Sequence, residues 1–269
     1  TRSLCDWSSD VCSSDLGACL AHIGHDVVCV DNNVEKVATL QTGKPPIYEP
    51  DLTDIMRSER LSFTTDLAAG VGHGDVIFIA VGTPPLPTGE SDTRYVEAVA
   101  RGIGEHIGSD YKVIVNKSTV PVGSGDWVRR LILDAVEHRG AQTSFEVVSN
   151  PEFLREGSAV YDTFNPDRIV LGGQSPRAIE RMRQLYAPIV TRQFALDPAL
   201  PAVPVVVTDL ASAETIKYAA NAFLATKISF INEIANICDR IGADVNQVAQ
   251  GIGLDRKSTR LNSSHTVIS

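Results

Sequence analysis

The sequence predicts an α/β fold in which a doubly wound parallel sheet is followed by one long helix. Short apolar runs alternate with helical patterns along most of the chain, and the runs end at turn residues such as Gly, Pro, Asn or Asp. Apolar runs of this kind are typical of strands buried on both faces of a parallel sheet. Their alternation with helices favours a doubly wound arrangement. Residues 210–241 then contain neither Pro nor Gly, which predicts the long helix.

The apolar runs give the expected strands in chain order. These are residues 26–30, 75–81, 112–115, 146–148 and 168–171. The helical patterns between them include residues 34–41 and 93–107. We therefore expect a Rossmann-like NAD-binding domain over residues 17–208, with its first strand missing or replaced, and Gly17 in the middle of the first helix.

Residues 209–254 form the second expected domain, an all-helical central domain that mediates dimerisation. Its helix would measure ~45 Å, which is longer than most helices within a single domain. Asp209 is the expected N-cap and Gly242 the residue after the C-cap. Residues 218–223 are mostly apolar, and we expect them to be buried.

The two ends of the chain are residues 1–16 and 255–269. Within them, residues 6–16 and 255–265 have neither helical nor strand periodicity. They could be disordered polar tails. However, one DNA strand that can encode residues 6–15 is the reverse complement of one that can encode residues 255–264, and it resembles a sequencing-library adapter. We therefore expect both ends to be foreign sequence.

Composition limits the possible partners. The net charge of −9 argues against a nucleic-acid surface and an acidic membrane partner. No apolar run is long enough to span a membrane. The five cysteines show no metal-ligand spacing, and Cys19 and Cys29 lie in apolar runs, so we expect no metal site and a reducing, cytoplasmic setting.

Asp31 is the expected contact with the adenosine ribose of a dinucleotide. It follows the apolar run 26–30, and an acidic side chain at the end of this strand accepts hydrogen bonds from ribose hydroxyls and repels a 2′-phosphate. This position favours NAD over NADP. The alternative is that Asp31 only caps the following helix.

Three further segments follow expected strands, where the carboxyl ends of a parallel sheet hold ligands. Thr83 lies in Gly-Thr-Pro, and Thr119 lies in the run 116–121; both could also be ordinary turns. In the run 150–157, Glu152 and Glu156 are four residues apart and would share one face of a helical turn. Paired carboxylates can divide acid–base work, although a solvated charged turn is the alternative.

Glu214, Lys217 and Asn221 lie on the long helix, with Lys217 and Asn221 one turn apart. An ammonium and an amide on one face can stabilise an oxyanion. The alternative is a surface ion pair between Glu214 and Lys217. The apolar neighbours of these residues favour a functional role, because buried polar side chains need a partner.

Four motifs together carry a resemblance to a known family. They are VGTPP (81–85), KSTVPVG (117–123), NPEFLREG (150–157) and ETIKYAANAFLATKISFINEIANICDRIGADV (214–245). In order and spacing they resemble the UDP-glucose/GDP-mannose dehydrogenases, and the resemblance covers residues 17–254. The run NPDRIVLGG (165–173) is more similar to the UDP-glucose branch than to the GDP-mannose branch.

The resemblance implies oxidation of the C6 alcohol of UDP-glucose to the carboxylate of UDP-glucuronate with two NAD, through a thiohemiacetal and a thioester on a catalytic cysteine. It assigns oxyanion stabilisation to Lys217 and Asn221, and water positioning and proton transfer to Glu152 and Thr119. The implied NAD contacts are Asp31, Lys36, Thr83, Thr119 and Glu156. The implied substrate contacts are Glu152, Phe153, Leu154, Arg155, Glu156, Lys217 and Asn221. The long helix would form the core of a homodimer.

The sequence departs from the family pattern at two places. It has no glycine-rich loop near its beginning and no Gly-Gly-Ser-Cys-Phe-Pro-Lys-Asp motif, and the helical context of Cys238 does not fit the nucleophile. We therefore expect the chain as written to be inactive. The alternatives are a GDP-mannose or other nucleotide-sugar dehydrogenase, a β-hydroxyacid dehydrogenase with a similar Lys–Asn pair, and a non-catalytic helical assembly module.

Overall fold

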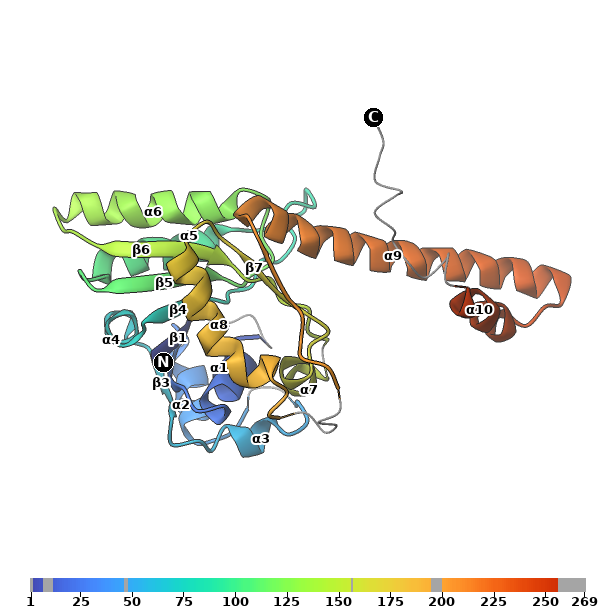
Figure 1. Cartoon of the computed structure of the whole chain (residues 1–269), viewed down its shortest axis with the longest axis horizontal. Coiled ribbons are helices and arrows are strands. Elements are labelled where there is room, and N and C mark those ends of the chain that lie inside the picture. The colour runs from blue at the N-terminus through green and yellow to red at the C-terminus, as the bar shows by residue number, and fades with distance from the viewer. Residues whose placement is uncertain (1, 7–11, 46–47, 156, 195–199, 256–269) are drawn as a thin grey trace. The chain divides into compact units, whose positions relative to one another are not determined.

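The computed structural model describes residues 2–6, 12–45, 48–155, 157–194 and 200–255 (Figure 1). The chain divides into two units, Thr1–Lys217 and Tyr218–Ser269. The first unit contains the sheet and its covering helices. The second contains only helices among its described residues.

The first unit is built on one eight-stranded sheet with the order β3-β2-β1-β4-β5-β6-β7-β8. The strands are β1 (Arg2–Asp6), β2 (Asp26–Val30), β3 (Leu61–Thr64), β4 (Val76–Ile79), β5 (Tyr111–Asn116), β6 (Ser144–Ser149), β7 (Ile169–Gly172) and β8 (Val205–Thr208). Neighbouring strands are parallel except β6 and β7, which meet antiparallel at Ser149 and Gly172. The chain thus builds the sheet outward from β1 in both directions, as in a doubly wound fold.

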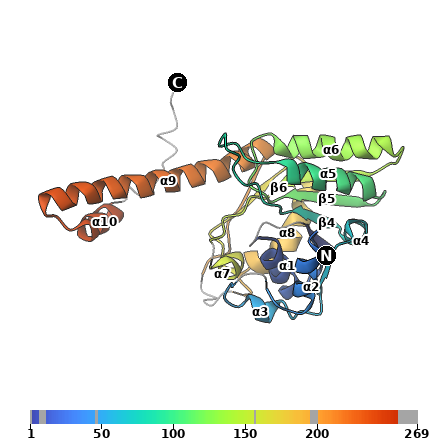
Figure 2. The ribbon, with the colours of Figure 1, turned by 180° about the vertical axis from the view of Figure 1, so that it is seen from behind.

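Helices cover both faces of this sheet (Figures 1 and 2). They are α1 (Cys12–His22), α2 (Val34–Gln41), α3 (Leu52–Ile55), α4 (Leu67–His73), α5 (Arg94–His106), α6 (Ser124–His138), α7 (Ala159–Phe164) and α8 (Pro176–Val190). One apolar core joins the sheet to α1 and α8. A second core joins the opposite face to α4, α5 and α6. The fold class expected from the sequence is therefore confirmed.

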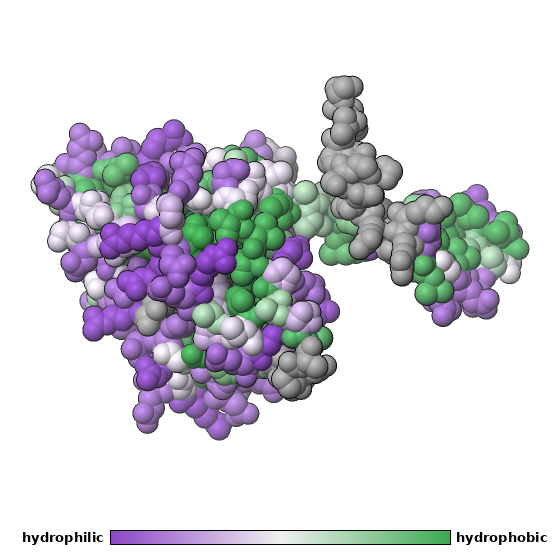
Figure 3. Space-filling model, in the orientation of Figure 1, coloured by the Kyte–Doolittle hydropathy of each residue, from purple (hydrophilic) through white to green (hydrophobic). Residues whose placement is uncertain are grey.

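The sequence placed β2 and α2 at their observed bounds. It placed β4, β5, β6, β7 and α5 with small shifts at their ends. It missed β3 and β8. In β3 (LSFT) polar residues interrupt the apolar ones, whereas β8 (VVVT) contains a short apolar run that was not assigned to a strand. In Figure 3 an apolar patch interrupts the mostly hydrophilic surface of the first unit. Val206 and Val207 of β8 are 40% and 42% exposed.

The first strand, which was expected to be missing or replaced, is present, and residues 12–16, which were expected to lack helical periodicity, are helical. Arg2–Asp6 forms β1 and pairs in parallel with both β2 and β4, and Cys12–Leu16 belongs to α1. The physical reason is the gap between β2 and β4. Their facing backbone groups would be unpaired in the middle of the sheet, which is costly, so the position imposes a strand on residues with no strand pattern. Residues 7–11, which follow β1, lie outside the described residues.

The long helix α9 (Leu210–Ile241) begins in the first unit and continues in the second, where α10 (Val245–Leu254) follows it. Its expected ends are confirmed. The Asp209 carboxylate accepts a hydrogen bond from the Ser212 amide at 2.8 Å, and Gly242 has a φ of 74°. No helix among the described residues is both long and apolar enough to cross a membrane.

The expectation that residues 218–223 are buried is wrong for the single chain. Tyr218 and Phe223 are 37% and 45% exposed, and Asn221 is also exposed. Further along α9, Ile228, Phe230 and Ile237 are more than half exposed. The stretch is apolar, as expected, but no described part of this chain buries it.

Candidate functional site

Asp31 lies at the carboxyl end of β2, close to the point where the strand order reverses between β1 and β4. Ligands of doubly wound folds bind at this reversal. Asp31 is buried; its carboxylate accepts the Asn33 amide at 2.9 Å and pairs with Lys36 at 3.3 Å. The helix-cap alternative for Asp31 is wrong, because the Asn33 side chain caps α2 by accepting the Lys36 amide.

Helix α1 packs very closely on β2, as a dinucleotide-binding turn requires. A Cβ atom built on Gly17 would collide with Sγ of Cys29 on β2, so any larger residue would require the Cys29 side chain to shift. The acidic group at the end of β2 fits an adenosine ribose with a free 2′-hydroxyl. The glycine contact between α1 and β2 fits the close helix–strand packing of a dinucleotide-binding fold. The residues that would surround the pyrophosphate lie outside the described residues.

The loops that follow β4 and β5 are joined by two hydroxyl groups. Thr83 Oγ1 donates to the Thr119 carbonyl at 2.6 Å, and Ser118 Oγ donates to the Val81 carbonyl at 2.7 Å. The two loops therefore form one surface at the carboxyl edge of the sheet. Thr119 itself is half-buried on this surface.

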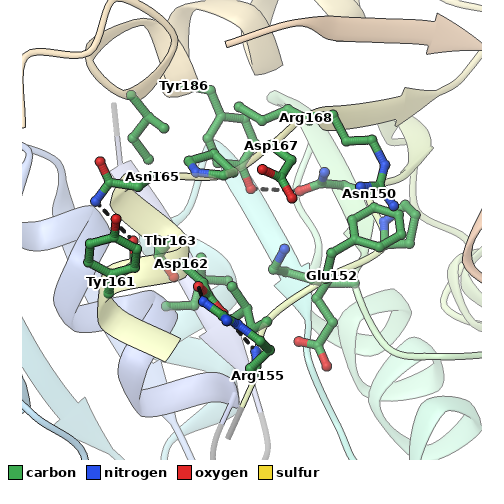
Figure 4. Close-up of a pocket in the computed structure, with 18 residues that line it drawn as sticks. Asn150, Glu152, Arg155, Tyr161, Asp162, Thr163, Asn165, Asp167, Arg168 and Tyr186 are labelled. Atoms are coloured by element: carbon green, nitrogen blue, oxygen red, sulfur yellow. Dashed lines mark hydrogen bonds and ion pairs between the residues drawn. The ribbon is translucent and has the colours of Figure 1, made fainter. Parts of the chain in front are cut away.

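A cavity of about 440 Å³ lies beside the loop that follows β6 (Figure 4). Four residues expected at the site, Glu152, Phe153, Leu154 and Arg155, line it. The other lining residues that carry polar side chains are Lys117, Asn150, Tyr161, Asp162, Thr163, Asn165, Asp167, Arg168 and Tyr186. No sequence pattern distinguishes these residues individually. Asp162 and Tyr186 lie in ordinary helical patterns, and the run 165–173 indicates only a resemblance to one branch of the family.

Asn150 anchors the start of this loop. Its side-chain amide donates to the Val170 carbonyl at 2.9 Å and accepts the Tyr186 hydroxyl at 2.6 Å. The Asn150 backbone amide donates to the Asn116 carbonyl at the end of β5. Three elements, β5, β7 and α8, thereby hold the point where the loop leaves β6.

Residues 151–155 form an irregular loop, so the helical turn expected to carry Glu152 is wrong. Pro151 lacks an amide hydrogen, and the next helix, α7, begins only at Ala159. Glu152 is half-buried. Glu156, expected to contact NAD and substrate, lies outside the described residues.

Lys217 is buried, and its ammonium donates to the backbone carbonyl of Glu152 at 2.6 Å. The same ammonium lies 5.4 Å from the centre of the Phe153 ring, and the Arg168 guanidinium stacks on that ring at 3.9 Å. Cations are attracted to aromatic faces at these distances. The loop thus holds one buried ammonium through a carbonyl and an aromatic ring.

Glu214 does not pair with Lys217, so the alternative of a surface ion pair between them is wrong. Its carboxylate accepts the amides of Gly123 and Gly125, at 2.6 and 2.8 Å, at the start of α6. Burial raises the pKa of the Glu214 carboxyl despite these two hydrogen bonds. Helix α9 is therefore fastened to the segment that also carries Thr119.

Arg155 pairs with Asp162 of α7 instead of extending alone into the cavity (Figure 4). Its guanidinium donates twice to the Asp162 carboxylate, at 2.9 and 2.6 Å, and its backbone amide donates once at 3.0 Å. These bonds hold the pKa of the Asp162 carboxyl below its usual value. Of the remaining expected residues, Asn221 belongs to the second unit.

The strand order, the acidic residue that ends β2 and the cavity at the carboxyl edge define the class of this protein as a Rossmann-type dinucleotide-binding α/β protein. Comparisons with known proteins narrow this class. Residues 14–190 match the model of the UDP-glucose/GDP-mannose dehydrogenase family, NAD binding domain, and residues 211–266 match the central domain of the same family. The chain belongs to the UDP-glucose/GDP-mannose dehydrogenase family.

Two curated relatives show how much of the family's length is present. The UDP-glucose 6-dehydrogenase TuaD of Bacillus subtilis is 51% identical over 248 residues, which cover 91% of this chain and 50% of TuaD. The UDP-glucose 6-dehydrogenase of Rhizobium meliloti is 48% identical over 89% of this chain and 53% of its own length. The chain thus spans about half the length of the curated relatives it matches.

Solved structures give the same result. A UDP-glucose dehydrogenase from the archaeon Pyrobaculum islandicum is 40% identical with a TM-score of 0.83, over 96% of this chain and 57% of that one. A GDP-mannose dehydrogenase from Pseudomonas aeruginosa is 31% identical with a TM-score of 0.85, over 100% and 59%. The family matches extend into residues 14–16 and 255–266, so the foreign origin of the two ends stays a prediction.

Proposed function

We propose that the protein represented by this chain oxidises UDP-glucose to UDP-glucuronate with NAD. The observation that carries the proposal is the buried Lys217 ammonium, which is held against the Glu152 carbonyl beside the cavity. A fixed ammonium in a site shielded from water stabilises negative charge that develops on a reacting oxygen. The named UDP-glucose 6-dehydrogenases supply the substrate class.

The other expected residues take roles around this group. Glu152 and Thr119 would position water and move protons, and Asn221 would assist Lys217 at the oxyanion. Thr83, Lys36 and Glu156 would contact NAD together with Asp31. Bound NAD would accept the hydride removed from C6 of the sugar, and two such steps with one water convert the alcohol to a carboxylate.

A chimera tests this proposal directly. Residues 17–254 would replace the matching half of Bacillus subtilis TuaD, and NADH formation from UDP-glucose would be followed by absorbance. We expect activity, and a loss of about 100- to 1000-fold in kcat for Lys217→Ala because one stabilising donor is removed. A folded chimera that binds NAD but oxidises GDP-mannose instead would contradict the UDP-glucose assignment.

The 269-residue chain by itself should bind NAD without turning over UDP-glucose, because none of its cysteines lies in the Gly-Gly-Ser-Cys motif of the family. We further propose that the protein acts in the cytoplasm, as a homodimer formed through α9. The exposed apolar residues of α9 support the dimer. NADH production from UDP-glucose by the purified chain would contradict the proposed inactivity.

A further inference from the structure

The loop that carries Glu152 is held from its far end by Asp162. Arg155 gives this single carboxylate three hydrogen bonds, two from the guanidinium and one from the backbone amide. Paired bonds between a guanidinium and a carboxylate fix orientation as well as distance. The carboxylate is the buried partner, since the Asp162 side chain is 13% exposed and the Arg155 side chain 71%.

Helix α7, which presents Asp162, is itself anchored. The Glu49 carboxylate is buried and accepts the Ala159 amide in the first turn of α7 at 2.5 Å. Val160 of the same helix lies in an apolar cluster with residues of α1 and α3. Asp162 is therefore presented from a fixed element, and the loop adjusts to it.

Between its two anchors the loop keeps ligand-binding groups available. Lys217 holds the Glu152 carbonyl at one end, and Asp162 holds Arg155 at the other. Phe153 and Leu154 line the cavity, and within the described residues their backbone amides donate no hydrogen bond. Two adjacent amides of this kind suit an anionic group such as a diphosphate.

We propose that Arg155 and Asp162 form a clasp that sets the shape of the loop 150–155 for a nucleotide-sugar ligand, so that Arg155 is a positioning residue and not a ligand contact. The ligand class rests on the proposed function, whereas the clasp does not. Two of the guanidinium nitrogens are already bonded to Asp162. A ligand would have to break those bonds before it could occupy the same paired edge of the guanidinium.

Asp162→Ala is the variant that separates the two roles. If Arg155 positions the loop, Asp162→Ala and Arg155→Ala weaken binding alike. If Arg155 contacts the anionic ligand, Asp162→Ala frees its guanidinium and leaves binding equal or tighter. The double exchange Arg155→Asp with Asp162→Arg rebuilds the pair in reverse and restores binding only in the first case.

The experiment uses the full chain and two measurements. Hydrogen exchange of the amides of residues 152–155 reports loop order without ligand, and calorimetric titration with UDP-glucose reports binding. We expect faster exchange and binding weaker by about two- to fivefold in each single variant, the effect of one partly exposed ion pair. The double exchange should return both values towards those of the unmodified chain. Arg60→Ala, which removes an exposed Arg60–Asp26 pair of 2.8 Å, is the matched control and should change neither.

Unchanged loop exchange in both single variants would overturn the clasp, and so would a loss of binding in Arg155→Ala that Asp162→Ala does not share. If the unmodified chain binds no UDP-glucose, the ligand class fails, while loop exchange still decides the clasp. A thermal melt of each variant identifies unfolding, in which case Asp162→Asn replaces Asp162→Ala.

Discussion

At the scale of single residues, Asp31 gives the most direct test of cofactor binding. Asp31→Asn keeps the size of the side chain but removes the charge that also pairs with Lys36. We expect the affinity of the chain for NAD to fall by about tenfold, because hydrogen bonds to a charged acceptor are lost. Discrimination against NADP should fall as well, since the 2′-phosphate is no longer repelled.

Calorimetric titration of the chain with NAD and with NADP measures both effects. Asp54→Asn, a change at a carboxylate that is 80% exposed on α3, is the control and should leave both affinities unchanged. An NAD affinity that Asp31→Asn does not alter would remove Asp31 from the cofactor site.

Sequence patterns could identify Lys217 and Glu152, but not how they meet. The contact joins an ammonium to a backbone carbonyl 65 residues away, and no side-chain pattern indicates which carbonyl that is. Asp162 was missed for a similar reason, because an aspartate on a short helix has no feature that distinguishes it. In both pairs, Lys217 with the Glu152 carbonyl and Asp162 with Arg155, only the tertiary fold determines which group is the partner.

At the scale of elements, Glu214 links α9 to the first turn of α6. Burial raises its pKa above the ordinary value of 4.5. Folding therefore favours the protonated carboxyl. The contribution of Glu214 to the free energy of unfolding is fully present below pH 4.5, and it is lost as the pH rises through the pKa of the folded state.

Glu214→Gln removes this titration, so the melting temperature of the unmodified chain minus that of the variant should decrease from pH 4.5 to pH 7. Other groups titrate equally in both proteins and cancel in the difference. Glu214→Ala should show the same trend with lower melting temperatures, because both hydrogen bonds to the α6 amides are lost. A difference that stays constant or increases with pH would contradict this account.

Elements with periodic apolar patterns were predictable, and those placed by their neighbours were not. The patterns indicated β2 and α2 because burial on both faces or on one stripe leaves a signal in the residue order, and the absence of Pro and Gly indicated α9. Strand β1 carries no such signal. It lies between β2 and β4, whose backbone groups pair with whatever segment fills the gap.

At the scale of the whole molecule, α9 is the expected dimer contact. Phe223, Phe230 and Ile237 recur every seven residues and are 45%, 53% and 52% exposed. Such a stripe is typical of a helix that packs against another helix. We expect Phe230→Glu to convert the dimer to a monomer, because a charge would be buried without a partner.

Light scattering after size-exclusion chromatography gives the mass of each species. Asn232→Glu adds the same charge two positions further on, approximately on the opposite side of α9, and should leave the dimer intact. A monomeric unmodified chain, or a dimer that survives Phe230→Glu, would exclude this stripe as the contact.

The bond between Glu214 and α6 also sets the rotational phase of α9. Each residue of a helix advances the azimuth by about 100°, so Lys217 points in a direction determined by Glu214 three residues earlier. Insertion of one residue between them would turn the ammonium by about 100° away from the Glu152 carbonyl, even if the helix remained intact. The number of residues between Glu214 and Lys217 therefore cannot change without turning the Lys217 side chain away from its partner. A substitution that keeps this number leaves the direction of Lys217 unchanged.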